Sequence, residues 1–220
     1  MVLKRVLEPE IMETARDARE YEAIDHSEVN REFVSTLADE LAFRSGALID
    51  LGAGPCELPV EICRRIKGAK IIAVEMAPPM LKLAAKKIAC SGFSRRIRLV
   101  KADAKDTGLP GGAFDFVACN NLIHHIADPL LIFREIARLL RPGGGIYVKD
   151  LLRPRTAAEL DAHMKNCSDD TPWQRELLRN SLRAALRPEE VAVYAQKAGL
   201  KGAVLTAAGD RHWQLRRRAA

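Results

Sequence analysis

Two glycines and two carboxylates stand where they can hold a nucleoside. Gly52 and Gly54 follow an apolar run, residues 47–51, and precede a helical pattern, so they fall where a strand meets a helix. Glycines there let the backbone approach a ligand, and the free N–H groups of the helix start face it. Glu75 and Asp103 end or follow the next two strand-like runs, where one carboxylate can accept from ribose hydroxyls and the other from the adenine amine. Together these residues predict a nucleoside cofactor.

Two adjacent histidines follow the fourth strand-like run, beside the expected reacting end of the cofactor. His124 or His125 can act as a general base or can orient an acceptor. The alternative is that adjacent histidines point opposite ways, and that at least one only packs or caps the following helix. Asp150, which ends the fifth run, either faces the substrate or bonds a loop N–H.

The positions of these residues depend on a repeating order of apolar runs and helical patterns. Buried strands separated by helices predict an α/β fold with a mostly parallel sheet that is covered by helices on both faces. The strands are expected at residues 47–51, 70–75, 97–101, 114–120 and 144–151, and the intervening helices at residues 58–66, 80–88 and 129–140.

The two ends of the chain differ from this central pattern. Residues 9–21, and a second stretch with Asp25 as its N-cap, are expected to form two amphipathic helices. Residues 156–198 are helical by period, and two strand-like runs then close the chain around a turn at Gly209 and Asp210. These runs are residues 202–206 and 212–216.

A single domain is expected, because α/β domains often reach about 250 residues and the chain has 220. Its parts are the N-terminal lid helices at residues 1–45, the cofactor-binding core at 46–152, a helical substrate cap at 153–199 and the closing strands at 200–220.

Composition excludes several classes of protein. With 48% hydrophobic residues the chain is too apolar to be disordered, and no window approaches the ~20 apolar residues of a membrane-spanning helix. The first residues turn acidic before a secretory signal could form, so we expect a cytoplasmic protein. The five cysteines are scattered with no C-x-x-C pair, which predicts neither disulfides nor a metal site. The net charge of +6 can attract anions or nucleic acid without choosing among them.

Five stretches of the chain resemble the class I S-adenosylmethionine-dependent methyltransferases, of the kind found in small-molecule and quinone-biosynthesis enzymes. They are residues 48–54, 73–76, 102–104, 114–125 and 138–145. The tail also looks like that of a bacterial branch of the superfamily. The resemblance implies a Rossmann-like, doubly wound sheet of seven strands whose last strand is antiparallel, and it implies S-adenosylmethionine as the cofactor.

The resemblance also implies which residues line that cofactor. They are Tyr21 in the lid, Asp50, Gly52, Ala53 and Gly54 at the methionine end, Asn120 and Leu122 at the sulfonium, Glu75 at the ribose, and Met76, Asp103 and Ala104 at the adenine. One position departs from the family pattern, since Cys56 stands where many members have a third glycine. Because Cys is small, we expect ordinary backbone geometry there and somewhat weaker cofactor binding.

These features predict transfer of a methyl group from S-adenosylmethionine to a small-molecule acceptor. The in-line displacement needs no metal, and alignment of the reactants alone can contribute roughly 7 to 11 kcal/mol. The acceptor atom and the oligomeric state, a homodimer included, stay open. No membrane insertion and no nucleic-acid partner are expected.

Three other functions share parts of this pattern. A nicotinamide dehydrogenase would need Gly or Ala at position 57 so that the helix can pack closely on the strand, and this chain has Glu57 there. An RNA methyltransferase would fit the basic charge, but methylation of base amino groups usually uses a proline-proline-aromatic motif, which residues 120–123 lack. A non-catalytic protein that only binds S-adenosylmethionine is indicated by Cys56 alone.

Overall fold

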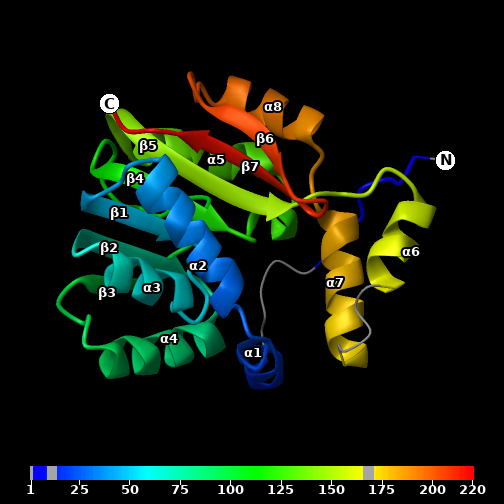
Figure 1. The fold of residues 1–220 in the computed structure, drawn as a ribbon, viewed down its shortest axis with the longest axis horizontal. Coiled ribbons are helices and arrows are strands. Elements are labelled where there is room, and N and C mark those ends of the chain that lie inside the picture. Colours follow the sequence, from blue (N-terminus) through cyan, green and yellow to red (C-terminus); the bar gives the residue numbers. More distant parts are fainter. Residues whose placement is uncertain (1, 9–13, 166–170) are drawn as a thin grey trace.

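The computed structural model describes residues 2–8, 14–165 and 171–220, and its centre is a seven-stranded sheet (Figure 1). The strand order is β3-β2-β1-β4-β5-β7-β6. Strands β1 to β5 pair in parallel, whereas β7 runs antiparallel to both of its neighbours. The predicted fold class is confirmed. The strands are β1 Ser45–Leu51, β2 Gly68–Glu75, β3 Ile97–Lys101, β4 Phe114–Asn120, β5 Leu140–Leu151, β6 Val204–Ala208 and β7 His212–Arg217.

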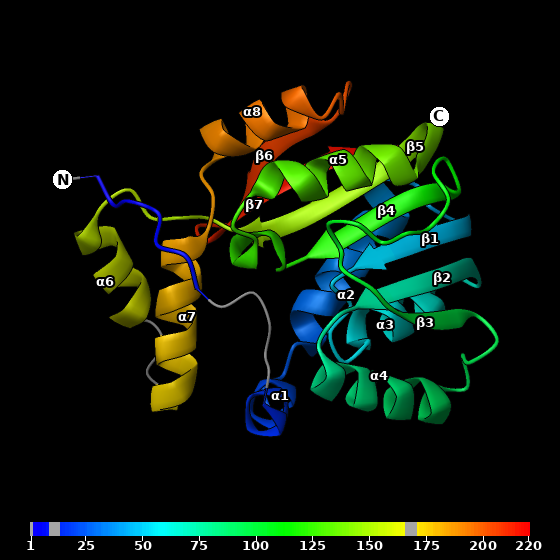
Figure 2. The same ribbon diagram turned by 180° about the vertical axis from the view of Figure 1, so that it is seen from behind.

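Helices cover both faces of the sheet, as Figure 2 shows from behind. One face carries α2 (Ser27–Ser35), which continues into a π-helical turn at Thr36–Glu40, together with α3 (Glu57–Arg65) and α4 (Pro78–Ser91). The other face carries α5 (Pro129–Leu139) and α8 (Pro188–Lys197). None of the helices in the described part of the chain has the length and apolar composition needed to cross a bilayer.

The period of two along β1 explains why both faces are covered. Leu48 packs into the core beneath α2 and α3, and Ile49 into the core beneath α5 and α8. Both side chains are fully buried, as expected for a parallel sheet between two helical layers. On the first face Phe33 of α2 stacks on Tyr147 of β5, with ring centroids 4.0 Å apart.

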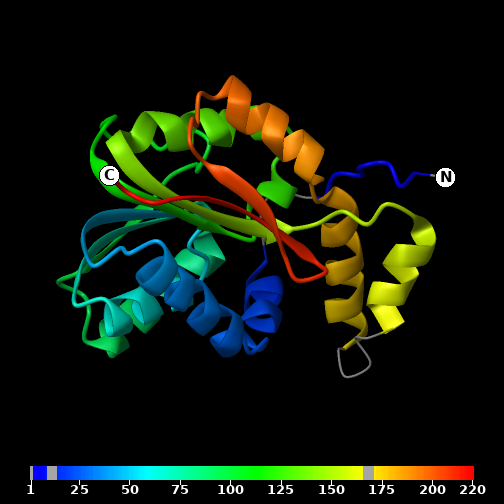
Figure 3. The ribbon, with the colours of Figure 1, turned by 45° about the horizontal axis from the view of Figure 1, so that its top comes forward.

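Three helices lie beyond the carboxyl ends of the parallel strands rather than on a face of the sheet (Figure 1). They are α1 (Ala15–Glu22), α6 (Ala157–Lys165) and α7 (Pro172–Ala184). Figure 3 shows the turn between β6 and β7 next to α7. These elements therefore surround the edge of the sheet where parallel strands place ligands.

Several element boundaries differ from the sequence prediction. Helix α2 begins at Ser27 with His26 as its N-cap, one residue later than the predicted cap at Asp25, and the Asp25 carboxylate accepts the Ser27 N–H at 2.8 Å. Strand β5 begins at residue 140 rather than 144, because its pairing with β4 shifts in register near Phe114. The expected helix at residues 9–21 is described only from residue 14, and Cys167 also lies outside the described residues.

An extended segment, residues 2–8, runs beside α7 and was not predicted. The N–H of Leu3 donates to the carbonyl of Arg155 at 2.8 Å. The Arg5 guanidinium donates to the carbonyls of Ala184, at 2.6 Å, and Ile126, at 2.7 Å. These bonds join the segment to the end of α7 and to the turn that follows β4.

Candidate functional site

The first functional loop follows β1, next to the point where the strand order reverses between β1 and β4. Open α/β sheets bind ligands outside the strand ends at such a point. Gly52 has φ +75°, and a Cβ there would lie 2.8 Å from the methyl groups of Leu122. Both its backbone conformation and its contact with Leu122 therefore require glycine.

Cys56 occupies a left-handed backbone conformation, with φ 63° and ψ 29°. The expectation of ordinary backbone geometry at this position is therefore wrong. The left-handed region costs an L-residue about 1 to 2 kcal/mol, which explains why glycine would suit it. Burial raises the pKa of the Cys56 thiol, as do the charges of Asp50 and Glu75, so this thiol is not a nucleophile near neutral pH.

The carboxylate of Glu75 lies at the centre of the strand-end crevice. It accepts the N–H of Gly54 at 2.9 Å on one oxygen, and those of Met76 and Ala77, both at 2.8 Å, on the other. A carboxylate has about four lone-pair positions, so three backbone donors hold it in place and leave one position for a ligand hydroxyl. This geometry suits the predicted contact with a ribose.

A narrow cleft of about 40 Å³ lies on one side of Glu75. Its walls include Met76, Asp103, Ala104 and Leu122, which sequence analysis placed around the adenine or the sulfonium. The Asp103 carboxylate accepts the N–H of Lys105 at 2.9 Å and pairs with the Lys105 ammonium at 3.1 Å. An adenine amine would therefore share Asp103 with Lys105.

A second cleft of about 50 Å³ lies on the other side of the loop. Its lining includes Tyr21, Asp50, Gly52, Ala53, Gly54 and Asn120, which are the residues predicted at the methionine end together with Asn120. Asp50 is 2% exposed, and burial together with the charge of Glu75 raises its pKa to about 7. Burial also raises the pKa of Tyr21 to about 12, so its hydroxyl stays protonated.

The second cleft contains buried acceptors that lack partners. The side-chain oxygens of Asn120 and Asn121 are buried and accept no hydrogen bond within the described ranges. Unpaired amide oxygens beside the Asp50 carboxylate suit a ligand with N–H donors and positive charge, as the ammonium end of S-adenosylmethionine has. Asn121, held at φ 52°, was missed in the sequence, where its two neighbours Asn120 and Leu122 were singled out.

A larger cavity of about 390 Å³ opens in front of both clefts and shares Gly52 with each of them. One wall is α7, which contributes Gln174, Leu177, Leu178 and Ser181. The start of β7 contributes His212, whose pKa burial and nearby Lys149 lower to about 4, so this imidazole is neutral at pH 7. Sequence analysis expected a substrate cap somewhere in residues 153–199, without identifying these side chains.

His124 and His125 lie side by side in a 3₁₀ turn (Ile123–His125) and both line this cavity. Their ring centroids are 4.1 Å apart, so they do not point in opposite directions. Asp150, which is 1% exposed, lies 2.6 Å from Nδ1 of His124 and accepts the N–H of Ile123 at 2.6 Å. Of the two predicted roles for Asp150, the structure therefore has the loop-bonding one.

The charge of Asp150 is stabilised by these neighbours. Burial alone would raise its pKa, but the charge and hydrogen bond of His124 and the N–H groups of Ile123 and Leu151 lower it below the usual value. An ionised Asp150 fixes the His124 ring and leaves its Nε2 directed away from the strand end.

Comparison with known proteins gives consistent matches. A methyltransferase domain model matches residues 49–148. A ubiquinone biosynthesis O-methyltransferase of Xanthomonas euvesicatoria is 28% identical, over 79% of this chain and 69% of its own. A demethylmenaquinone methyltransferase of Thermus thermophilus is 29% identical, over 74% and 73% of the two chains. Among solved structures, a Methanococcus maripaludis protein assigned to the S-adenosylmethionine-dependent methyltransferases superimposes with a TM-score of 0.75 at 18% identity, over 98% of both chains.

Substitution of Gly52 tests the close approach between its loop and Leu122. Gly52→Ala should lose about 1 to 2 kcal/mol of stability, because an alanine is strained at this positive φ. It should also displace the Leu122 side chain into the cleft that Leu122 lines. Gly199→Ala is the matched control, because Gly199 has φ +74° and open space around its Cβ position. Both variants should unfold at a lower temperature than the wild type, but only Gly52→Ala should have a lower affinity for S-adenosylhomocysteine, as measured by calorimetry. Equal affinities in the two variants would contradict this assignment.

Proposed function

Because this chain belongs to the class I S-adenosylmethionine-dependent methyltransferases, we propose that it transfers the methyl group to a hydroxyl oxygen of a small-molecule acceptor. The transfer of a methyl group from S-adenosylmethionine is the activity of the family. The choice of oxygen and the residues that hold each reactant are our proposals.

The observation that carries the proposal is the connection between the cofactor clefts and the cavity that contains the two histidines. Glu75 would bind the ribose, with Met76, Asp103 and Ala104 around the adenine. Asp50 and Tyr21 would hold the methionine end. Asn120 and Leu122 would then lie beside the sulfonium, and its methyl group would face His124 and His125 across the cavity.

The reaction forms one bond and breaks another at the methyl carbon. The acceptor oxygen bonds to this carbon, the carbon–sulfur bond breaks, and its electron pair stays on sulfur, which yields neutral S-adenosylhomocysteine. A hydroxyl must lose its proton to become a good nucleophile, and we propose that the histidine pair assists this loss. The rate of this in-line displacement depends mainly on the alignment of the acceptor oxygen, the methyl carbon and the sulfur, and the rigid strand ends provide this alignment.

Cavity size favours a small acceptor over a nucleic acid. A volume of about 390 Å³ lies in the ordinary range for small-molecule sites. One named relative is an O-methyltransferase of ubiquinone biosynthesis and the other is a methyltransferase of demethylmenaquinone, which supports a quinone-like ring compound as the acceptor and, from the first relative, oxygen as the acceptor atom. A cytoplasmic location and a homodimer stay predictions of the sequence.

The acceptor atom is tested with paired substrates. Methyl-labelled S-adenosylmethionine should transfer label to phenols and catechols, and much less to the anilines of the same shape. The measurement is label recovered on the separated product. Label on the anilines alone would contradict oxygen transfer, and transfer to RNA that falls steeply with salt would revive the rival RNA function.

Glu75 is tested by calorimetry with S-adenosylmethionine, S-adenosylhomocysteine and NADH. The wild type should bind the first two and not the third. Glu75→Ala should lose at least about 100-fold in affinity, because hydrogen bonds to charged groups contribute roughly 1.5 to 3 kcal/mol each and the loop also loses its anchor. Glu61→Ala, which removes a partly exposed carboxylate from α3, is the control. Unchanged affinity in Glu75→Ala would place the cofactor elsewhere.

Asp50 should make cofactor binding depend on pH. Its pKa of about 7 means that it is largely protonated below neutrality, whereas the methionine ammonium pairs with the ionised form. Affinity for S-adenosylhomocysteine should therefore fall, by as much as about 20-fold, between about pH 7.5 and about pH 5.5. Asp50→Asn should bind weakly with a flat profile. An equally steep profile in Asp50→Asn would assign the dependence to another group.

A further inference from the structure

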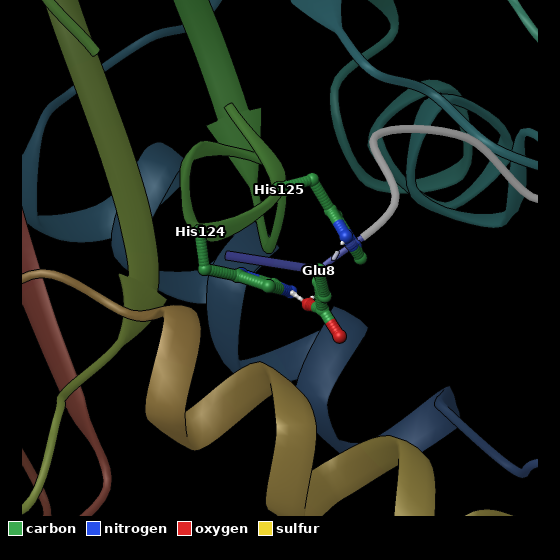
Figure 4. Close-up of side chains that lie close together, drawn as sticks. All are labelled: Glu8, His124 and His125. Carbon is green, nitrogen blue, oxygen red and sulfur yellow. Dashed lines mark ion pairs between the residues drawn. The ribbon is translucent and has the colours of Figure 1, made fainter. Parts of the chain in front are cut away.

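Three ligand-type side chains from two distant parts of the chain converge at the acceptor cavity. Figure 4 shows the Glu8 carboxylate between the imidazole rings of His124 and His125. Glu8 Oε1 lies 3.1 Å from His125 Nδ1 and 3.7 Å from His124 Nε2. All three ligand atoms lie within 4.8 Å of one another. We call these three residues the Glu8 cluster.

The Glu8 cluster is buried, and two of its polar atoms lack hydrogen-bond partners among the described residues. The side chains of Glu8, His124 and His125 are 7%, 4% and 19% exposed. Glu8 Oε1 and His125 Nδ1 have no hydrogen-bond partner among the described residues, since their mutual contact lacks hydrogen-bond geometry. A buried carboxylate oxygen and imidazole nitrogen without partners are costly, and a shared cation would satisfy both.

Outer contacts hold each member of the cluster in the orientation that a metal ligand needs. Asp150 engages Nδ1 of His124, which leaves Nε2 for the centre of the cluster. Carboxylates commonly hold metal-binding histidines in this way. The other oxygen of Glu8 accepts the Ser181 hydroxyl at 3.3 Å, and Arg5 anchors the extended segment three residues earlier.

The charges around the cluster also favour a cation. Glu8 and Asp150 carry two negative charges, and the nearby guanidinium of Arg5 supplies one positive charge. The separations of Glu8 from the two histidines, 3.1 Å and 3.7 Å, are close to the value of about 3.3 Å expected between ligands that lie about 2.0 Å from a tetrahedral zinc ion.

We propose that Glu8, His124 and His125 bind a divalent transition metal ion, with zinc as the best match to two imidazole nitrogens and one carboxylate oxygen. The proposal departs from the metal-free site expected from the sequence, where only the cysteines were considered as ligands. Three protein ligands leave one position open, which is typical of catalytic rather than structural zinc.

The role of the ion rests on the proposed function. Both histidines line the acceptor cavity, so the open position is within reach of an acceptor hydroxyl. Binding of that oxygen to a cation would favour its ionised form, so the histidines would assist the loss of the proton as ligands of the ion rather than as bases, and the hydroxyl proton would pass to water. The oxygen then attacks the methyl carbon, and the electron pair of the broken bond stays on sulfur.

Metal binding is tested on tag-free full-length protein without cofactor or acceptor. After dialysis against a chelator, calorimetric titration with zinc chloride should show one site of about micromolar or tighter affinity. Cobalt chloride should give visible absorption bands of a low-symmetry site. Glu8→Gln should weaken zinc binding by more than about 100-fold, and Asp150→Asn by roughly 10- to 100-fold, as expected when a metal-bound histidine loses its outer partner.

His163→Gln is the matched control, because the His163 side chain is 17% exposed, close to the value for His125, and lies on α6 outside the cluster. It should bind zinc as the wild type does. Absence of a zinc site in the wild type, or a site that Glu8→Gln and His125→Ala leave unchanged, would overturn the proposal. Melting curves of each variant identify any that fails to fold, and the cobalt spectrum of the wild type needs no variant.

The zinc titration, together with the methylation assay on phenols, separates this proposal from the proposed function. Zinc binding without methylation of any hydroxyl would overturn oxygen transfer and leave the metal site standing. Methylation of a phenol at an unchanged rate in chelated protein that binds no zinc would overturn the metal site and leave oxygen transfer standing.

Discussion

The proposed cofactor half of the site depends on one carboxylate. Glu75 accepts three backbone N–H groups, one from the loop after β1 and two from its own strand end. These bonds join the ends of two neighbouring strands, so the loop, the start of α4 and the crevice between them form one unit. The clefts on its two sides are lined by the polar residues that were predicted to hold the two ends of a single elongated ligand. If Glu75 moved, neither cleft would keep its shape.

The acceptor half has a different basis, because its residues come from segments that are far apart in sequence. Arg5 donates to carbonyls of α7 and of the turn after β4, and it thereby brings the N-terminal segment against both. Asp150 joins the same turn to the end of β5. The cavity is the space that remains between these elements and the β6–β7 turn. Tertiary packing therefore determines which side chains line this cavity.

This difference explains how much could be predicted from the sequence. The mostly parallel sheet and the strand-end positions of Gly52, Glu75 and Asp103 follow from local periodicity and spacing, which nearby residues determine. The antiparallel last strand was expected only from the resemblance to the family. Glu8, Ser181 and His212 carry no local signal, because nothing beside them in the chain shows which surface they will meet. Cys56 is an intermediate case, since its position was recognised but its left-handed backbone was not.

The central claim is that one elongated cofactor spans Glu75 and directs its sulfur toward the histidine cavity. A crystal structure of the protein with S-adenosylhomocysteine tests it most directly. The account predicts ribose hydroxyls on Glu75, the ammonium group beside Asp50 and the sulfur open toward His124 and His125. A ligand bound elsewhere, or one whose sulfur is sealed from that cavity, would contradict it.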